Sequence, residues 1–306
     1  MKYIMETNCL TRSFKGKKAV DNVTMHVKKG EIYGFVGPNG AGKTTILKML
    51  LNLIQPDEGT ITIFGSPLSC DRSEHLKRIG SIIENPYFYE RLTGQENLEM
   101  HCMYMGYQNT EDIGKVLELV SLSEAAGKEV VHYSLGMKQR LAIAHAILTK
   151  PEFLILDEPI NALDPEGIRQ MRNLFVHLRD EENTTILISS HILSEVEMIA
   201  DTIGILKNGS LKREISMDEV HASHIEYMEL EVDNPGRAGY LLEQALHITD
   251  YKIFSSTRLQ IYDPSVTGRE ISALFIQNGI GLESMYKKKN SLEDYFFELT
   301  GEEERS

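Results

Sequence analysis

Hydrophobic positions in the first two-thirds of the chain follow two alternating patterns, and each pattern predicts a different element. Short continuous apolar runs, such as 31–36 and 153–156, are typical of strands covered on both faces. Apolar residues at helical spacing follow them, as at Ile168, Met171 and Leu174. Because strands and helices take turns along the chain, the pattern predicts an α/β domain with a largely parallel core sheet.

Two segments interrupt this alternation. Residues 3–29 show the alternating pattern of strands joined by turns, which predicts an antiparallel β subdomain. Between about 87 and 150 the chain is mainly helical, beginning with a capping-box sequence from Thr93 to Glu96. One apolar stripe of this segment consists of Ile113, Val116, Leu117 and Val120. We therefore expect a helical lobe inserted into the α/β domain.

The pattern changes after residue 215. From 225 onwards it predicts the order strand, helix, strand, strand, helix, strand, followed by a closing helix at Ser291–Leu299. This order is typical of a small α+β domain of ferredoxin-like type. We therefore expect two domains, residues 1–215 and 216–306.

Composition narrows the class of protein. A chain of 306 residues with 42% hydrophobic and 25% charged residues is typical of a globular protein with more than one core. No apolar run approaches the roughly 18 residues that a membrane helix needs, so we expect a cytosolic chain unless a partner carries it to a membrane. The net charge of −13 argues against a nucleic-acid partner. The three cysteines lack the spacing of a zinc or redox site.

The segment Gly37–Thr44 fills every fixed position of the phosphate-binding motif G-x-x-x-x-G-K-[ST], between a predicted strand and a predicted helix. Glycines let the backbone wrap around an anion, and the helix N-terminus adds positive potential. We expect Lys43 to reach the terminal phosphates and Thr44 to hold Mg²⁺. An ordinary glycine-rich turn is the alternative. The predicted nucleotide-binding residues are Gly37, Pro38, Asn39, Gly40, Ala41, Gly42, Lys43, Thr44 and Thr45.

Charged residues follow the next apolar strands. Asp157 and Glu158 end the run at 153–156, where Asp157 would lie beside Mg²⁺ and Glu158 could orient or deprotonate an attacking water. His191 ends the following strand and could hydrogen-bond the γ-phosphate while holding Glu158 in place. Alternatively, the two acids cap a turn and the histidine is an ordinary surface residue. Phe14 could stack on a base, although a strand aromatic is as often simply packed.

These motifs, in this order, resemble the ATP-binding subunit of ABC transporters over about residues 1–215. Gly37–Thr44 matches the Walker A loop, 153–158 matches the Walker B strand with its glutamate, and Asn161–Asp164 matches the D-loop. His191 matches the switch histidine. The resemblance implies an ATPase that uses ATP and Mg²⁺, in which Asp164 belongs to the nucleotide site. The catalytic residues that it implies are Lys43, Glu158 and His191.

Three further positions complete the resemblance. Tyr133–Met137 is similar to the signature LSGGQ, of which Ser134 and Gly136 remain, and Phe14 matches the base-stacking aromatic. Two such domains pair head to tail, so Ser134 and Gly136 would complete the nucleotide site of the other copy. Where the family usually has glutamine, this chain has Glu84. Glu84 could touch Mg²⁺ or its water, although its charge would repel the γ-phosphate unless the metal screens it.

The resemblance also implies partners and a location. With no membrane span of its own, the chain would need a separate permease and would lie at the cytoplasmic face of the bacterial membrane. The segments 84–86, 135–140 and 291–296 are similar to the exporters that protect against bacitracin and lantibiotics, which implies a peptide or similar amphipathic cargo. A soluble ABC ATPase acting on the ribosome or DNA is the alternative, although the acidic C-terminal third disfavours it. A nucleotide-regulated module that does not hydrolyse ATP is a third.

Overall fold

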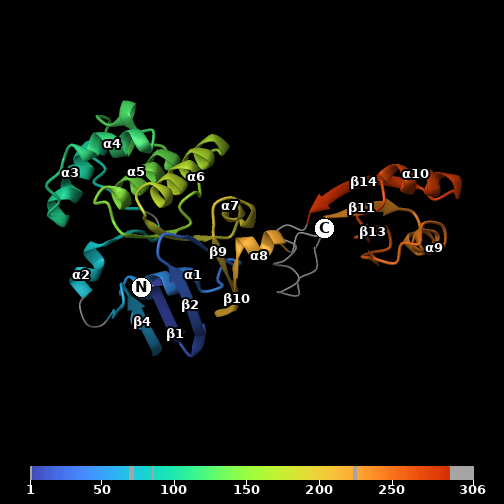
Figure 1. The fold of residues 1–306 in the computed structure, drawn as a ribbon. Coiled ribbons are helices and arrows are strands. Elements are labelled where there is room, and N and C mark those ends of the chain that lie inside the picture. The colour runs from blue at the N-terminus through green and yellow to red at the C-terminus, as the bar shows by residue number, and fades with distance from the viewer. Residues whose placement is uncertain (1, 69–71, 85, 223–225, 290–306) are drawn as a thin grey trace. The chain divides into compact units, whose positions relative to one another are not determined.

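The computed structural model describes residues 2–68, 72–84, 86–222 and 226–289. The chain divides into two compact units between Asp218 and Glu219 (Figure 1). The boundary that the sequence predicted, after residue 215, lies three residues earlier. Among the described residues, no helix combines the length and the apolar character that a bilayer crossing requires.

A six-stranded sheet forms the centre of the first unit, in the order β10-β9-β3-β8-β7-β6. Five neighbouring strands are parallel, and β10 pairs antiparallel with β9 at one edge. Their bounds are β3 Ile32–Val36, β6 Ile79–Ile82, β7 Phe153–Asp157, β8 Thr185–Ser190, β9 Thr202–Lys207 and β10 Ser210–Ser216. Every residue of β3, β7 and β8 is buried, as expected of strands covered on both faces. The predicted parallel α/β core is confirmed.

A second, antiparallel sheet covers one side of this core, in the order β2-β1-β4-β5. Its strands are β1 Tyr3–Phe14, β2 Lys17–Lys28, β4 Glu58–Ile63 and β5 Ser66–Pro67. Helix α1, Lys43–Leu50, lies between the two sheets (Figure 1). Leu10 and Val23 of the antiparallel sheet share one apolar cluster with Phe35 of β3 and Ile46 of α1. Burial of this cluster therefore fixes α1, and with it the phosphate loop, against both sheets.

The helical lobe lies on the other side of the core (Figure 1). The helices of the first unit, besides α1, are α2 Arg72–Lys77, α3 Gly94–Met105, α4 Asp112–Leu119, α5 Leu135–Ile147, α6 Pro165–Asp180 and α7 Leu193–Glu197. Between 106 and 131 the helical content is lower than predicted, with α4 and short 3₁₀ turns at Ser123–Ala125 and Val130–His132. Gly106, at φ 65°, ends α3 in the left-handed conformation. Leu141 of α5 and Phe175 of α6 pack in one cluster with Leu154 of β7.

The second unit contains a four-stranded antiparallel sheet in the order β12-β13-β11-β14. Its elements are β11 Glu226–Val232, α9 Pro235–Leu246, β12 Tyr251–Ile253, β13 Arg258–Ile261, α10 Gly268–Gln277 and β14 Leu282–Lys289, while α8 Met217–Ala222 lies at the division between the units. Leu230 of the sheet packs with Leu242 of α9 and Phe275 of α10. This is the βαββαβ arrangement that the sequence predicts. The predicted closing helix at Ser291–Leu299 lies outside the described residues.

Candidate nucleotide site

The phosphate loop connects the end of β3 to the start of α1. Gly40 and Gly42 have φ values of 78° and 108°, a region that glycine enters without steric cost. Gly37 is required for space, because a Cβ atom there would lie 2.3 Å from the carbonyl oxygen of Leu206. Pro38, Asn39 and Gly40 are exposed, whereas Ala41 and Lys43 are buried. The loop therefore presents its exposed turn to solvent and packs its flanks against the unit.

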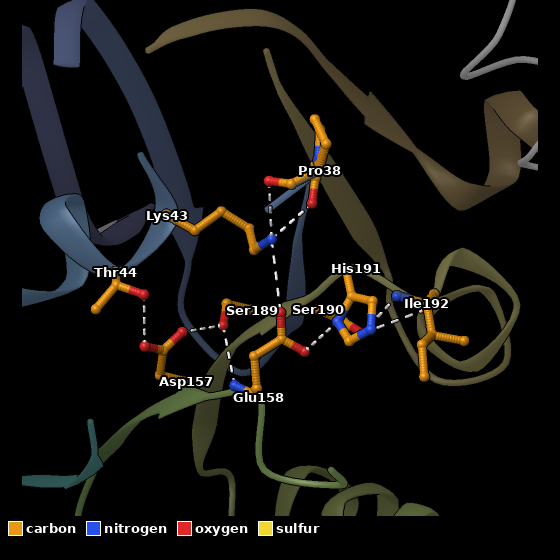
Figure 2. Close-up of polar contacts among 10 residues, drawn as sticks. Pro38, Lys43, Thr44, Asp157, Glu158, Ser189, Ser190, His191 and Ile192 are labelled. Atoms are coloured by element: carbon orange, nitrogen blue, oxygen red, sulfur yellow. Dashed lines mark hydrogen bonds and ion pairs between the residues drawn. The ribbon is translucent and has the colours of Figure 1, made fainter. Parts of the chain in front are cut away.

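Lys43 lies across this loop. Its Nζ donates to the carbonyl oxygens of Gly37 (2.6 Å) and Pro38 (3.5 Å) and lies 3.5 Å from Oε1 of Glu158 (Figure 2). The side chain is only 6% exposed. Because this buried ammonium is held mainly by two neutral carbonyl oxygens, it attracts a further anion strongly. A phosphate oxygen would be such an anion.

Asp157 lies between two hydroxyl groups at the carboxyl edge of the core sheet. Thr44 Oγ1 donates to its Oδ2 (2.7 Å), and Ser189 Oγ donates to its Oδ1 (2.5 Å) (Figure 2). In an open parallel sheet, ligand sites form where the strands end. Asp157 ends β7 and pairs in register with Ser189, one residue before the end of β8. Hydroxyl and carboxylate oxygens are the ligands that Mg²⁺ prefers. Thr44 and Asp157 therefore fit the metal expected with ATP.

Glu158 and His191 form a second pair beside Asp157. Oε2 of Glu158 lies 2.9 Å from Nδ1 of His191, and Oε1 of Glu158 faces Lys43 (Figure 2). Glu158 has φ 49°, and its N–H donates to the Oγ (3.0 Å) and the carbonyl oxygen (3.2 Å) of Ser189. The Glu158 side chain is 20% exposed, so water has access to its carboxylate.

Ser189 is a site residue whose role the sequence did not reveal. Its hydroxyl touches both Asp157 and the N–H of Glu158, and thus ties the two acids to β8. The two serines that precede His191 were the available signal. The spacing of these serines from Asp157 does not by itself show that they lie beside it. That follows only once β7 and β8 are known to be neighbours in the sheet.

Phe14 lies at the end of β1 and is 45% exposed. The guanidinium of Arg12 lies 5.1 Å from the centre of its ring, and Arg12 Nη1 is fixed by Asp57 at 2.6 Å. One side of the ring is therefore occupied by a cation, and the exposed remainder is open to a stacking partner. Thr45, also expected at the site, is the third residue of α1.

The signature residues lie at the start of α5. Ser134 is exposed and caps the helix by accepting from the N–H of Met137 (3.2 Å). At Gly136 a Cβ atom would lie 3.2 Å from the carbonyl oxygen of Ala162, in the loop that leads to Asp164. Asp164 caps α6. Among the described residues, the contacts of Ser134, Gly136 and Asp164 stay within 134–168, and the chain does not join them to its own phosphate loop.

Glu84 follows β6 in the left-handed conformation, at φ 60°. Its Oε1 lies 2.5 Å from Nζ of Lys48, on the same helix as Thr44 but one turn further along. The carboxylate is 62% exposed. The structure thus gives Glu84 a cation as its neighbour, and a contact of Glu84 with Mg²⁺ stays a prediction.

Comparison with known proteins shows which family this chain resembles. The ABC transporter family matches residues 20–161. The uncharacterised ABC transporter ATP-binding protein YcbN of Bacillus subtilis (strain 168) is 52% identical over 98% of this chain and 97% of that protein. The bacitracin transport ATP-binding protein BcrA of Bacillus licheniformis is 44% identical over 98% of both chains.

A solved structure gives the same assignment. The dimeric, post-hydrolysis structure of the ATP-binding cassette MJ0796, bound to ADP and Pi, superposes with a TM-score of 0.64 and 26% identity, over 70% of this chain and 98% of the cassette. The resemblance that the motifs indicated is confirmed, and so is the P-loop fold. The chain belongs to the ATP-binding subunits of ABC transporters, which bind and hydrolyse ATP, work with membrane permeases and form dimers.

Proposed function

We propose that this chain hydrolyses Mg-ATP in a site that a second copy completes, and that the cycle drives a permease exporting a peptide antibiotic or similar amphipathic compound. The observation that carries the proposal is the convergence of Lys43, Thr44, Asp157, Glu158 and His191 at one edge of the core sheet. The chain would act at the cytoplasmic face of the membrane, bound to its permease.

The residues divide the work of hydrolysis. Lys43 exchanges its loop carbonyl partners for the oxygens of the terminal phosphates. Thr44 and Asp157 would hold Mg²⁺, which would supply positive charge beside the terminal phosphates. Glu158 accepts the proton of the attacking water at its carboxylate. His191 orients that carboxylate through Oε2.

The signature residues support a site shared by two copies. Ser134 and Gly136 lie at the N-terminus of the 13-residue helix α5, where they are exposed or half-exposed. Within the described ranges of the chain, they make no contact with their own phosphate loop. A helix N-terminus attracts an anion through its free N–H groups and its dipole. In a head-to-tail pair, this end of α5 would face the γ-phosphate held by the other copy.

Cargo and partner are inferred from the full-length relatives. The match to the bacitracin transport protein BcrA extends over 98% of both chains, so it includes the C-terminal unit as well as the ATPase unit. That extent favours a transporter subunit over the alternative of a soluble ATPase on the ribosome or DNA. The net charge of −13 points the same way, because nucleic-acid binding needs basic surfaces.

ATP turnover by Glu158→Gln tests the catalytic assignment. The amide keeps the size of the side chain but cannot accept the proton, so we expect kcat to fall about 100-fold or more while ATP still binds. Glu182→Gln, at an exposed acid in the turn after α6, is the matched control and should leave kcat unchanged. Turnover in Glu158→Gln equal to that of the wild type would remove Glu158 from the mechanism.

Light scattering tests the shared site. Glu158→Gln with Mg-ATP should run as a dimer, since hydrolysis no longer separates the two copies. The double variant with Gly136→Asp should stay monomeric, because a carboxylate there repels the γ-phosphate of the partner site. A dimer in both proteins would contradict the head-to-tail assignment.

Cargo is tested in cells. The permease is identified by copurification with the tagged chain from membranes of its own host, and both are then expressed in a bacitracin-sensitive bacterium. The wild-type pair should raise the inhibitory concentration of bacitracin above that of the Glu158→Gln pair. Equal sensitivity would exclude bacitracin and leave the ATPase assignment intact.

A further inference from the structure

Two segments outside β3 and α1 pack against the phosphate loop. The first is the turn between β9 and β10, at Asn208 and Gly209. The second is the beginning of β2. The N–H of Gly209 donates to the carbonyl oxygen of Ala41 in the loop (2.9 Å), and the carbonyl oxygen of Gly209 accepts from the N–H of Asp21 (2.8 Å). Gly209 is buried and is thus bonded to both neighbours.

The same three segments are packed backbone against backbone. A Cβ atom at Gly42 would lie 2.6 Å from the carbonyl oxygen of Ala19 and 3.6 Å from the Cα of Gly209. A Cβ atom at Gly209 would lie 2.8 Å from the same oxygen and 3.1 Å from the carbonyl carbon of Ala19. Both glycines therefore close on one carbonyl group, and neither position has room for a side chain.

The bond from Gly209 also sets the direction of an amide in the loop. In a trans peptide, the carbonyl and the following N–H point to opposite sides, and the residues that the structure describes contain no cis peptide bond. Because the carbonyl of Ala41 points to Gly209, the N–H of Gly42 points away from the β9–β10 turn. An amide that is already aimed before the ligand arrives costs less entropy when an anion binds.

We propose that Gly209 is a positioning residue for the phosphate site, which holds the 41–42 peptide in its anion-binding orientation and contributes to nucleotide affinity without touching the nucleotide. The proposal rests on the proposed nucleotide role of Gly37–Thr44. Asn208 and Gly209 have φ values of 51° and 80°, as a two-residue hairpin turn requires, so the turn itself has a defined shape.

Gly209→Ala tests the proposal against a matched control, Gly30→Ala. Gly30 has φ 77°, close to the 80° of Gly209, but no atom of the described part of the chain lies within 4 Å of a Cβ atom placed there. The backbone strain of alanine is therefore similar in both variants, and only Gly209→Ala pushes against Ala19 beside the phosphate loop. We expect the KM for Mg-ATP to rise about tenfold in Gly209→Ala and less than about twofold in Gly30→Ala, with kcat at saturating ATP within about threefold of wild type in both.

Hydrogen exchange without nucleotide gives a readout that a general loss of stability does not produce. Amides of residues 37–45 should exchange faster in Gly209→Ala than in Gly30→Ala at matched thermal stability. Equal KM values and equal exchange in the two variants would overturn the proposal. If the wild type binds no ATP, the proposed function fails instead.

A second pair of variants covers the case in which Gly209→Ala does not fold. Asn208 of the β9–β10 turn and Asn183 of the connection between α6 and β8 are both exposed and have positive φ, 51° and 54°. Valine strains the backbone at either position because a β-branched residue avoids this region. Asn208→Val should raise the KM for Mg-ATP about threefold and Asn183→Val should not. The same KM in both would overturn the proposal.

Discussion

His145 offers a prediction whose size follows from the structure. His101 of α3 and His145 of α5 lie with ring centres 3.5 Å apart, and both are partly buried in the helical lobe. Burial lowers the pKa of His101. Burial, and secondarily the charge of His101, lowers the pKa of His145 from 6.5 to about 4. The folded lobe therefore holds both rings neutral at pH values where an unfolded histidine is protonated.

This shift links stability to pH. Between pH 6.5 and pH 4 the unfolded chain binds a proton at His145 that the folded chain does not, so the free energy of unfolding rises with pH across this window. At pH 5.0 the contribution of His145 is about 2 kcal/mol less than at pH 7.5. For a unit of this size, that loss corresponds to a fall in Tm of roughly 4–8 °C.

Thermal unfolding of wild type and His145→Gln at pH 7.5 and 5.0 measures the effect. Glutamine is polar and of similar size but does not titrate, so we expect the wild type to lose about 4–8 °C more than His145→Gln between the two pH values. His177→Gln, at an exposed position of α6, is the control and should keep the wild-type pH dependence. An equal loss in wild type and His145→Gln would refute the reasoning, because the rings would then not be held neutral by burial.

Three further predictions concern single charged side chains of the first unit. Arg12→Met removes the cation over the ring of Phe14. Because this contact of about 0.5–1 kcal/mol holds the ring and not the nucleotide, nucleotide titration should show affinity reduced by no more than about two- to fivefold, and a larger loss would mean that Arg12 contacts the nucleotide itself. Glu84→Gln removes an exposed ion pair with a lysine of α1, so Tm should change by no more than about 3 °C and ATP turnover should stay at or above wild type. A loss of Mg²⁺-dependent turnover would instead identify Glu84 as a metal ligand. Hydrogen bonds from Lys150, a tyrosine and a second lysine hold the pKa of Asp112 well below its usual range. A carboxyl group with a depressed pKa stabilises the fold fully above about pH 4 and less as the pH falls further. The Tm of Asp112→Asn should therefore lie below that of the wild type at neutral pH, and the difference should shrink in acid. A difference that does not change with pH would contradict this.

The convergence of most residues of the candidate nucleotide site could be predicted from the sequence because its parts are local. Gly37–Thr44 is one uninterrupted segment, and Asp157 with Glu158 follows directly on a fully apolar strand. The ends of parallel strands meet at one edge, so the order of the elements was enough to bring these residues and His191 together. The same held for the C-terminal unit, where the order of strands and helices indicated the βαββαβ fold.

Contacts between distant segments required the tertiary structure. Ser189 bonds to both acids from a neighbouring strand, and Glu84 faces Lys48 across 36 positions of sequence. The helical stripe of the lobe suggested more helix than the chain forms, because Gly106 and the turns after α4 end the helices early. Periodicity records which residues are buried, but it does not record where a helix stops.

The sequence by itself determined the chemistry of this protein: a phosphate loop, two acids after a buried strand, and a histidine after the next. These are local patterns, and local sequence fixes which backbone and side-chain groups a segment offers. Only the tertiary structure decided how the loop is held. The N–H of Gly209, in the turn between β9 and β10, donates to the carbonyl oxygen of Ala41 although the two residues are far apart in the sequence. Such backbone contacts depend on which strands become neighbours in the sheet, and backbone groups are the same in every residue, so they leave little signal in the sequence.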